Sequence, residues 1–158
     1  MYTKDEISHQ ASQMKLTKDV VKQTNISKIP SQQAIFIGCG TSYYLAIAAA
    51  RYFQVKTGIT AQAFPASDLF LHPEMIISKD MTYTLFSISR SGTTTEIEIA
   101  LEAINDYSNV HKIAITCYGD TPIHKKSDEA IVLEHISEKS VVMTQSFTNM
   151  LYAIQCYV

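Results

Sequence analysis

The chain has 158 residues, of which 46% are hydrophobic and 18% are charged, and its formal net charge is −2. This balance fits one globular domain rather than a disordered chain, and the small negative charge argues against a general nucleic-acid surface. No apolar run approaches the roughly 18 residues of a membrane span, the first residues are charged, and three cysteines suit a reducing compartment. We therefore expect a cytoplasmic protein with neither a nucleic acid nor a membrane as partner.

Strand and helix patterns alternate along the chain. A capping box formed by Thr3 and Glu6 predicts a first helix that extends to about Thr24. Apolar, β-prone runs predict buried strands at residues 34–37, 59–64, 83–88, 111–117 and 130–133. Helical spacing and stop signals predict a helix ending at residues 57–58, a short one at 67–72, one after residue 92, a short one from 122 and a last one from about 144 to 158.

This alternation predicts a parallel sheet with helices on both faces. The expected fold class is α/β, a three-layer αβα sandwich around a five-stranded parallel sheet in the flavodoxin-like order 2-1-3-4-5. We expect residues 1–158 to form a single domain, with residues 1–30 as N-terminal helix and linker and residues 31–158 as the core. In this order the first and third strands are neighbours that the chain leaves in opposite directions, which predicts a ligand crevice outside their carboxyl ends.

Small and hydroxyl-bearing residues follow both of these strands. G-C-G-T-S runs from Gly38 to Ser42, and S-R-S-G-T-T runs from Ser89 to Thr94. Hydroxyls, backbone amides and the positive end of a helix dipole favour an anion, and phosphate is the obvious one. Arg90 can add a bidentate contact to that anion, or it can turn outward between its two serines. The alternative is that both loops are only turns and helix caps, since Ser, Thr and Gly are common there.

Other chemistries find less support in the sequence. Gly38 and Gly40 begin a pattern like a dinucleotide fingerprint, but Tyr43 occupies the third glycine position and no acid ends the second strand. Cys39 has no obvious histidine partner and is better explained as a small packing residue. The five histidines show no helical ligand spacing and no accompanying cysteines. We expect no cofactor and no metal.

Three motifs occur here in an order known from one family. They are G-C-G-T-S after the first strand, S-x-S-G-x-T after the third, and E-K-S-V-V-M-T-Q-S-F-T (residues 138–148) before the last helix. They resemble the sugar isomerase (SIS) domain, which has the sheet deduced above and binds phosphosugars at these loops. With the early T-x-x-E-I-x-x-Q (residues 3–10), the chain is most similar to AgaS-type proteins, which are tagatose-6-phosphate ketose/aldose isomerases and amino-sugar-phosphate deaminases. The isomerase half of glucosamine-6-phosphate synthase is a more distant relative.

The resemblance implies which residues bind a sugar phosphate. The phosphate would be bound by Thr41, Ser42, Ser89, Arg90, Ser91 and Thr94, and the sugar by Gly40 and Val141. Thr93 departs from the family pattern, because the synthase has a glutamate there. AgaS-type enzymes and the synthase also use two SIS domains in tandem, and their catalytic glutamate and ring-opening histidine come from the second. That second domain is absent from the sequence, so half of the enzyme is expected to be missing.

The catalytic residues therefore stay unassigned, with Glu138 as the one weak candidate for a base and a helix cap as its alternative role. Two hypotheses remain. The chain is the N-terminal half of a phosphosugar isomerase or deaminase, or it is a sugar-phosphate-sensing module without chemistry of its own. We also expect a homodimer, because an apolar last helix would leave a patch exposed unless a partner covers it; the patch comprises Leu151, Tyr152, Ile154 and Val158.

Overall fold

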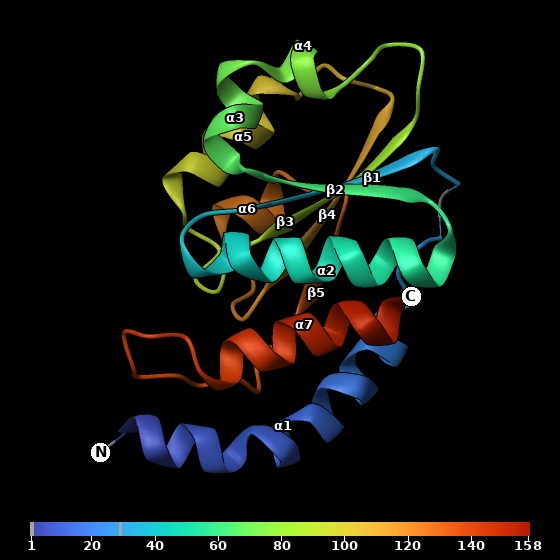
Figure 1. Ribbon diagram of the computed structural model, residues 1–158. Coiled ribbons are helices and arrows are strands. Elements are labelled where there is room, and N and C mark those ends of the chain that lie inside the picture. Colours follow the sequence, from blue (N-terminus) through green and yellow to red (C-terminus); the bar gives the residue numbers. More distant parts are fainter. Residues whose placement is uncertain (1, 29) are drawn as a thin grey trace.

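The five predicted strands form one parallel sheet in the computed structural model, which describes residues 2–28 and 30–158. The spatial order is β2-β1-β3-β4-β5, as predicted (Figure 1). The strands are β1 (Gln33–Gly38), β2 (Thr60–Pro65), β3 (Tyr83–Ile88), β4 (Val110–Thr116) and β5 (Glu129–Val132). All six residues of the central β3 are buried, which agrees with its uninterrupted apolar sequence.

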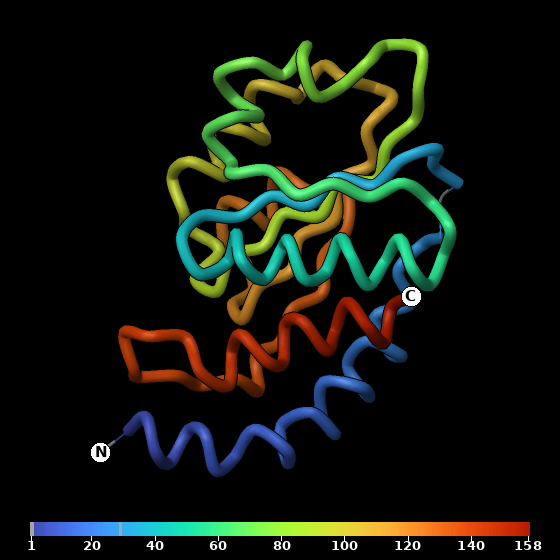
Figure 2. The backbone as a smooth tube through the Cα atoms, in the orientation of Figure 1, coloured from blue at the N-terminus to red at the C-terminus, as the bar shows by residue number. Residues whose placement is uncertain are grey.

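The helices cover both faces of the sheet and make the three-layer sandwich (Figures 1 and 2). On one face lie α1 (Tyr2–Thr24), α2 (Thr41–Thr57) and α7 (Gln145–Tyr157), and on the other lie α3 (Ala66–Leu71), α4 (Pro73–Ile76), α5 (Thr95–Ala103) and α6 (Pro122–Lys125). Alternate strand residues supply the two cores, because successive side chains of a strand point to opposite faces. Phe36 and Phe86 stack 4.5 Å apart in the first core, whereas Ile35 and Leu85 belong to the second.

One local prediction was wrong. Thr3 lies inside α1 and bonds Ser140, while the Glu6 carboxylate accepts hydrogen bonds from the connector before α7, so the two residues form no capping box. The error arises from tertiary contacts that the periodicity of the sequence does not encode. The structure also adds a short helix, α4, with Pro73 in its first turn.

The apolar face of the last helix is covered by the chain itself. Ile154 is fully buried, and Leu151 and Val158 pack against the core that lies under α2 and α7. The helix α1 lies along α7, and together with the core it covers much of the patch that led to the dimer prediction (Figure 2). None of the described helices has the length and apolarity needed to cross a membrane.

Candidate functional site

The predicted crevice lies at the carboxyl ends of β1 and β3. These strands are paired in parallel, with Ile37 opposite Ser87, so they end at the same edge of the sheet. From that edge the chain continues from β1 into α2 on one face and from β3 into α5 on the other face. Two loops therefore face each other across the topological switch point, the usual place for a ligand in such a sheet. We call residues 39–42 the first loop and residues 89–94 the second loop.

Two glycines shape the entry to the first loop. A Cβ on Gly38 would lie 2.5 Å from the Ser42 carbonyl carbon, so only glycine lets the end of β1 approach α2 this closely. Gly40 has φ 53°, a left-handed conformation that suits glycine. Thr41 is exposed, whereas Ser42 is buried and its Oγ lies 3.8 Å from the Met143 sulfur. No side chain caps the N-terminus of α2, although the amides of Ser42 and Tyr43 donate at 3.1 Å to the carbonyl oxygens of Cys39 and Gly40.

The hydroxyls of the second loop form a network. Ser89 is buried; its Oγ accepts from the Gly92 amide at 3.0 Å and lies 2.8 Å from the Thr94 hydroxyl. Ser91 is exposed, and its Oγ accepts a 3.2 Å hydrogen bond from the Thr93 amide. The N-terminus of α5 has no side-chain cap either. The carboxyl ends of β1 and β3 are therefore flanked by hydroxyls and by two helix N-termini without side-chain caps, a combination that favours a bound anion.

A third segment, which we call the connector (residues 137–144), reaches both loops. It joins β5 to α7 and projects at the edge where β1 and β3 end (Figure 1). Met143 contacts Ser42 of the first loop, as noted above. From the second loop, Arg90 Nη1 donates to Glu138 Oε2 at 2.9 Å and to the Ser140 carbonyl oxygen at 3.0 Å. The three motifs that are separated in the sequence thus meet at one place.

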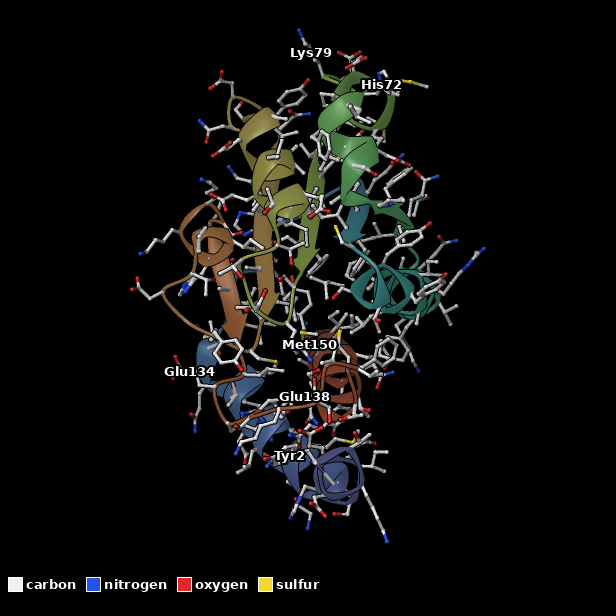
Figure 3. The ribbon with its side chains drawn as sticks, turned by 90° about the vertical axis from the view of Figure 1, so that its left-hand side faces the viewer. Tyr2, His72, Lys79, Glu134, Glu138 and Met150 are labelled. Carbon is white, nitrogen blue, oxygen red and sulfur yellow. The ribbon has the colours of Figure 1, made fainter. Side chains whose placement is uncertain are left out.

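Glu138 uses its carboxylate to hold this place together. It lies between α1 and α7 (Figure 3), and its side chain is only 1% exposed. Besides Arg90, it accepts from the amide (2.8 Å) and hydroxyl (2.7 Å) of Thr144 and from the amide and hydroxyl of Ser146. Burial raises the pKa of Glu138, but the hydrogen bonds from Ser146, Arg90 and Thr144 outweigh burial and hold the pKa below its usual value. A carboxylate occupied by five donors caps a helix and orients Arg90, and it has no free lone pair with which to act as a base.

The predicted site residues lie in the two loops and the connector, and they differ in how far they are exposed. Thr41, Ser91 and Gly40 are exposed, Thr94 and Arg90 are half-buried, and Ser42 and Ser89 are buried. Val141 is 92% exposed at the tip of the connector. Arg90 does not turn outward, because its Nη1 is directed into the connector, and 29% of its side chain remains exposed.

Neither thiol nor metal chemistry gains support at this site. Burial, together with the nearby Glu96 carboxylate, raises the pKa of the Cys39 thiol, which keeps the sulfur protonated and poorly nucleophilic. Within residues 2–28 and 30–158, no three His, Cys, Asp or Glu side chains are grouped so that they could hold a metal ion.

Sequence reasoning missed the contribution of α1 to this region. Glu6 is 7% exposed, and its Oε1 accepts from the amides of Lys139 (2.7 Å) and Ser140 (3.1 Å). Thr3 Oγ1 lies 2.9 Å from Ser140 Oγ. The capping-box interpretation assigned both side chains to their own helix. The signal that could have revealed the distant partner is the burial of the Glu6 carboxylate, because a buried carboxylate is almost always paired, and the sequence does not show that burial.

Comparison with known proteins relates the whole arrangement to one family. The SIS domain family model matches residues 29–158. The chain is 30% identical over 119 residues to an isomerizing glutamine–fructose-6-phosphate aminotransferase of Pseudomonas syringae pv. tomato, with 75% of this chain and 19% of that protein covered. It is 28% identical over 149 residues to the D-galactosamine-6-phosphate deaminase AgaS of a Shewanella species, covering 82% and 36%.

A solved structure gives the same result. The glucosamine-6-phosphate deaminase from Thermotoga maritima is 28% identical, with a TM-score of 0.80, and the match covers 98% of this chain and 48% of that one. The chain therefore spans less than half the length of each of these three proteins.

Proposed function

This chain belongs to the SIS domain family, and from that premise we propose that it binds a sugar phosphate in the crevice between β1 and β3. The observation that carries the proposal is the meeting of two uncapped helix N-termini, their hydroxyl-bearing loops and the connector at one switch point. Phosphate suits this place because backbone amides and hydroxyls donate to its oxygens while the helix dipoles favour its charge.

Within this proposal each segment has its own part. The phosphate contacts the first and second loops, through Thr41, Ser42, Ser89, Arg90, Ser91 and Thr94. Arg90 holds the connector with Nη1, and its remaining N–H groups are the ones proposed to face the anion. The sugar extends toward Gly40 and Val141, whose exposed positions leave them free to contact it. No cofactor has a part in this binding.

We further propose that the chain derives from an enzyme that isomerises or deaminates sugar phosphates. The named activities of the Pseudomonas and Shewanella relatives support this origin. Because Glu138 is fully engaged in hydrogen bonds, we propose that the catalytic base lies in a second SIS domain or a partner chain. The alternative, a sugar-phosphate-sensing module without chemistry, needs the same crevice but no base.

Thermal unfolding with a panel of hexose 6-phosphates, inorganic phosphate and NADH tests the binding proposal. A ligand at about 100 times its dissociation constant adds roughly 2.7 kcal/mol, and each kcal/mol shifts the midpoint by about 2–4 °C at this size. We expect at least one hexose 6-phosphate to raise the midpoint and NADH to leave it unchanged. The proposal would be contradicted if only NADH shifted the midpoint, or if none of the ligands in the panel shifted it.

Two serine variants make the test specific to the crevice. Ser91→Ala removes an exposed hydroxyl of the second loop, and we expect it to abolish most of the ligand-induced shift. Ser108→Ala removes an exposed serine just before β4, at the opposite edge of the sheet, and should leave the shift intact. Equal shifts in both variants would place the ligand elsewhere. Release of ammonium or a ketose from the bound sugar would favour the enzyme over the sensing module.

A further inference from the structure

The helix α1 reaches the candidate site although all of it lies outside the part of the chain that the family model matches. The match begins at residue 29, whereas α1 spans Tyr2–Thr24. Two side chains from its first two turns, Thr3 and Glu6, bond the connector. These contacts are made more than 130 positions along the chain, so they are tertiary contacts and not part of the helix start.

Ser140 is the residue on which these contacts converge. Its carbonyl oxygen accepts from Arg90 of the second loop, its amide donates to Glu6, and its hydroxyl meets that of Thr3. One residue is thus held from the anion-binding side by Arg90 and from the opposite side by α1. Val141 follows it directly and makes almost no contact of its own, since it is 92% exposed.

Glu6 and Glu138 share a second point of attachment. The Thr144 hydroxyl lies 3.3 Å from Glu6 Oε2 and 2.7 Å from Glu138 Oε1. Glu6 therefore holds both ends of the segment from Ser140 to Thr144 that carries Val141, and Glu138 holds its Thr144 end. Hydrogen bonding from Ser140 lowers the pKa of Glu6 against the opposing effect of burial, which keeps the carboxylate ionised at neutral pH.

We propose that α1 is part of the ligand site, with Glu6 and Thr3 as positioning residues that set where the connector meets the sugar portion of the ligand. The inference rests on the proposed function, since it assumes that the crevice binds a sugar phosphate. It predicts a separation of effects. Loss of the α1 contacts weakens recognition of the sugar, which the connector contacts, and spares recognition of the phosphate, which the two loops contact.

The test measures dissociation constants by calorimetry for inorganic phosphate and for the hexose 6-phosphate that raises the melting temperature most. Glu6→Ala removes the acceptor of the connector amides while keeping a strong helix former. We expect it to weaken the hexose 6-phosphate on the order of tenfold, as for the loss of one hydrogen bond to a charged group, with inorganic phosphate unchanged. Thr3→Val removes one hydroxyl contact and should act in the same direction with a smaller effect.

Asp5→Ala is the matched control, because Asp5 is an exposed neighbouring carboxylate whose side chain bonds none of the residues described. It should leave both constants unchanged. Hydrogen exchange gives an independent readout: the amides of Lys139 and Ser140 should exchange faster in Glu6→Ala than in Asp5→Ala.

The outcomes separate this inference from the proposed function. If the unchanged protein binds neither ligand, the proposed function falls and the inference falls with it. If the unchanged protein binds and neither Glu6→Ala nor Thr3→Val alters the ratio of the two constants, the inference alone is overturned. Equal losses for both ligands would also overturn it, since they would show general destabilisation of the site.

Discussion

Gly92 shows how a single residue shapes the second loop. Its φ of 67° is left-handed, and a Cβ at this position would collide with the Thr121 side chain just before α6. Gly58 offers a comparison, because its φ of 73° is similar but a Cβ there would meet no atom within 4 Å. The two glycines separate the cost of backbone conformation from the cost of a steric clash.

We predict that Gly92→Ala destabilises the protein by about 3 kcal/mol, the sum of backbone strain and overpacking. Gly58→Ala should cost only about 1 kcal/mol, from the left-handed conformation alone. Urea denaturation of both variants measures the difference. Similar losses at the two positions would show that Thr121 moves aside.

The residues of the site differ in how far the sequence could predict them. That both loops lie at the same edge of the sheet was predicted, because the strand order places β1 beside β3 in parallel; their role in binding stays a prediction. The direction of Arg90 was left open, since its partners Glu138 and Ser140 lie about 50 positions away and come close only when the sheet is formed. Glu6 was misread for the same reason, at a separation of 133 positions.

At the scale of elements, the connector depends on carboxylates that must stay charged. The folded-state pKa of Glu138 is lowered, so its contribution to stability is present above the unfolded-state pKa and is lost as the pH falls through the folded-state value. The attachment of the connector through Glu138 should therefore weaken in acid.

We predict that Glu138→Gln lowers the free energy of unfolding at pH 7 by about 2 kcal/mol, the size of a hydrogen bond to a charged group. The difference from the unchanged protein should shrink as the pH falls below 4.5, the ordinary pKa of a glutamate side chain. Denaturant titrations at pH 7 and near pH 3 measure both differences. Glu74→Gln, at a side chain that is 69% exposed, is the control and should change little at either pH.

At the scale of the whole molecule, the homodimer remains a prediction, but the surface that supports it is now α2 and not the last helix. The last helix no longer supports it, because α1 and the core cover most of its apolar face. Apolar side chains do remain exposed on α2, with Tyr44 at 69% and Val55 at 80%. Exposed residues of this kind are often covered by a second subunit.

Light scattering coupled to size-exclusion chromatography tests this expectation. A homodimer would give twice the chain mass of 17.7 kDa. A single species at 17.7 kDa over a wide range of concentrations would contradict the prediction. Adding the best hexose 6-phosphate to the same experiment would show whether ligand and assembly are linked.

The overall architecture was the most predictable level. Alternating apolar runs and helical spacing predicted all five strands and their order, because a parallel sheet buried on both faces leaves a strong pattern. The short α4 was not predicted, because a single helical turn is too short to show helical periodicity in the sequence. The packing of α1 against α7 was not predicted, because an amphipathic pattern shows that a helix has a buried face but not which element packs against it.

The attachment of the connector to α1 also bears on when the site can form during synthesis. Glu6 leaves the ribosome before its partners Lys139 and Ser140, which follow 133 and 134 positions later. The first two strands and the helix between them can be assembled while α1 still lacks those partners, because domains are built from the N-terminus onward. The attachment of the connector to α1 therefore forms only after the connector itself has emerged from the ribosome.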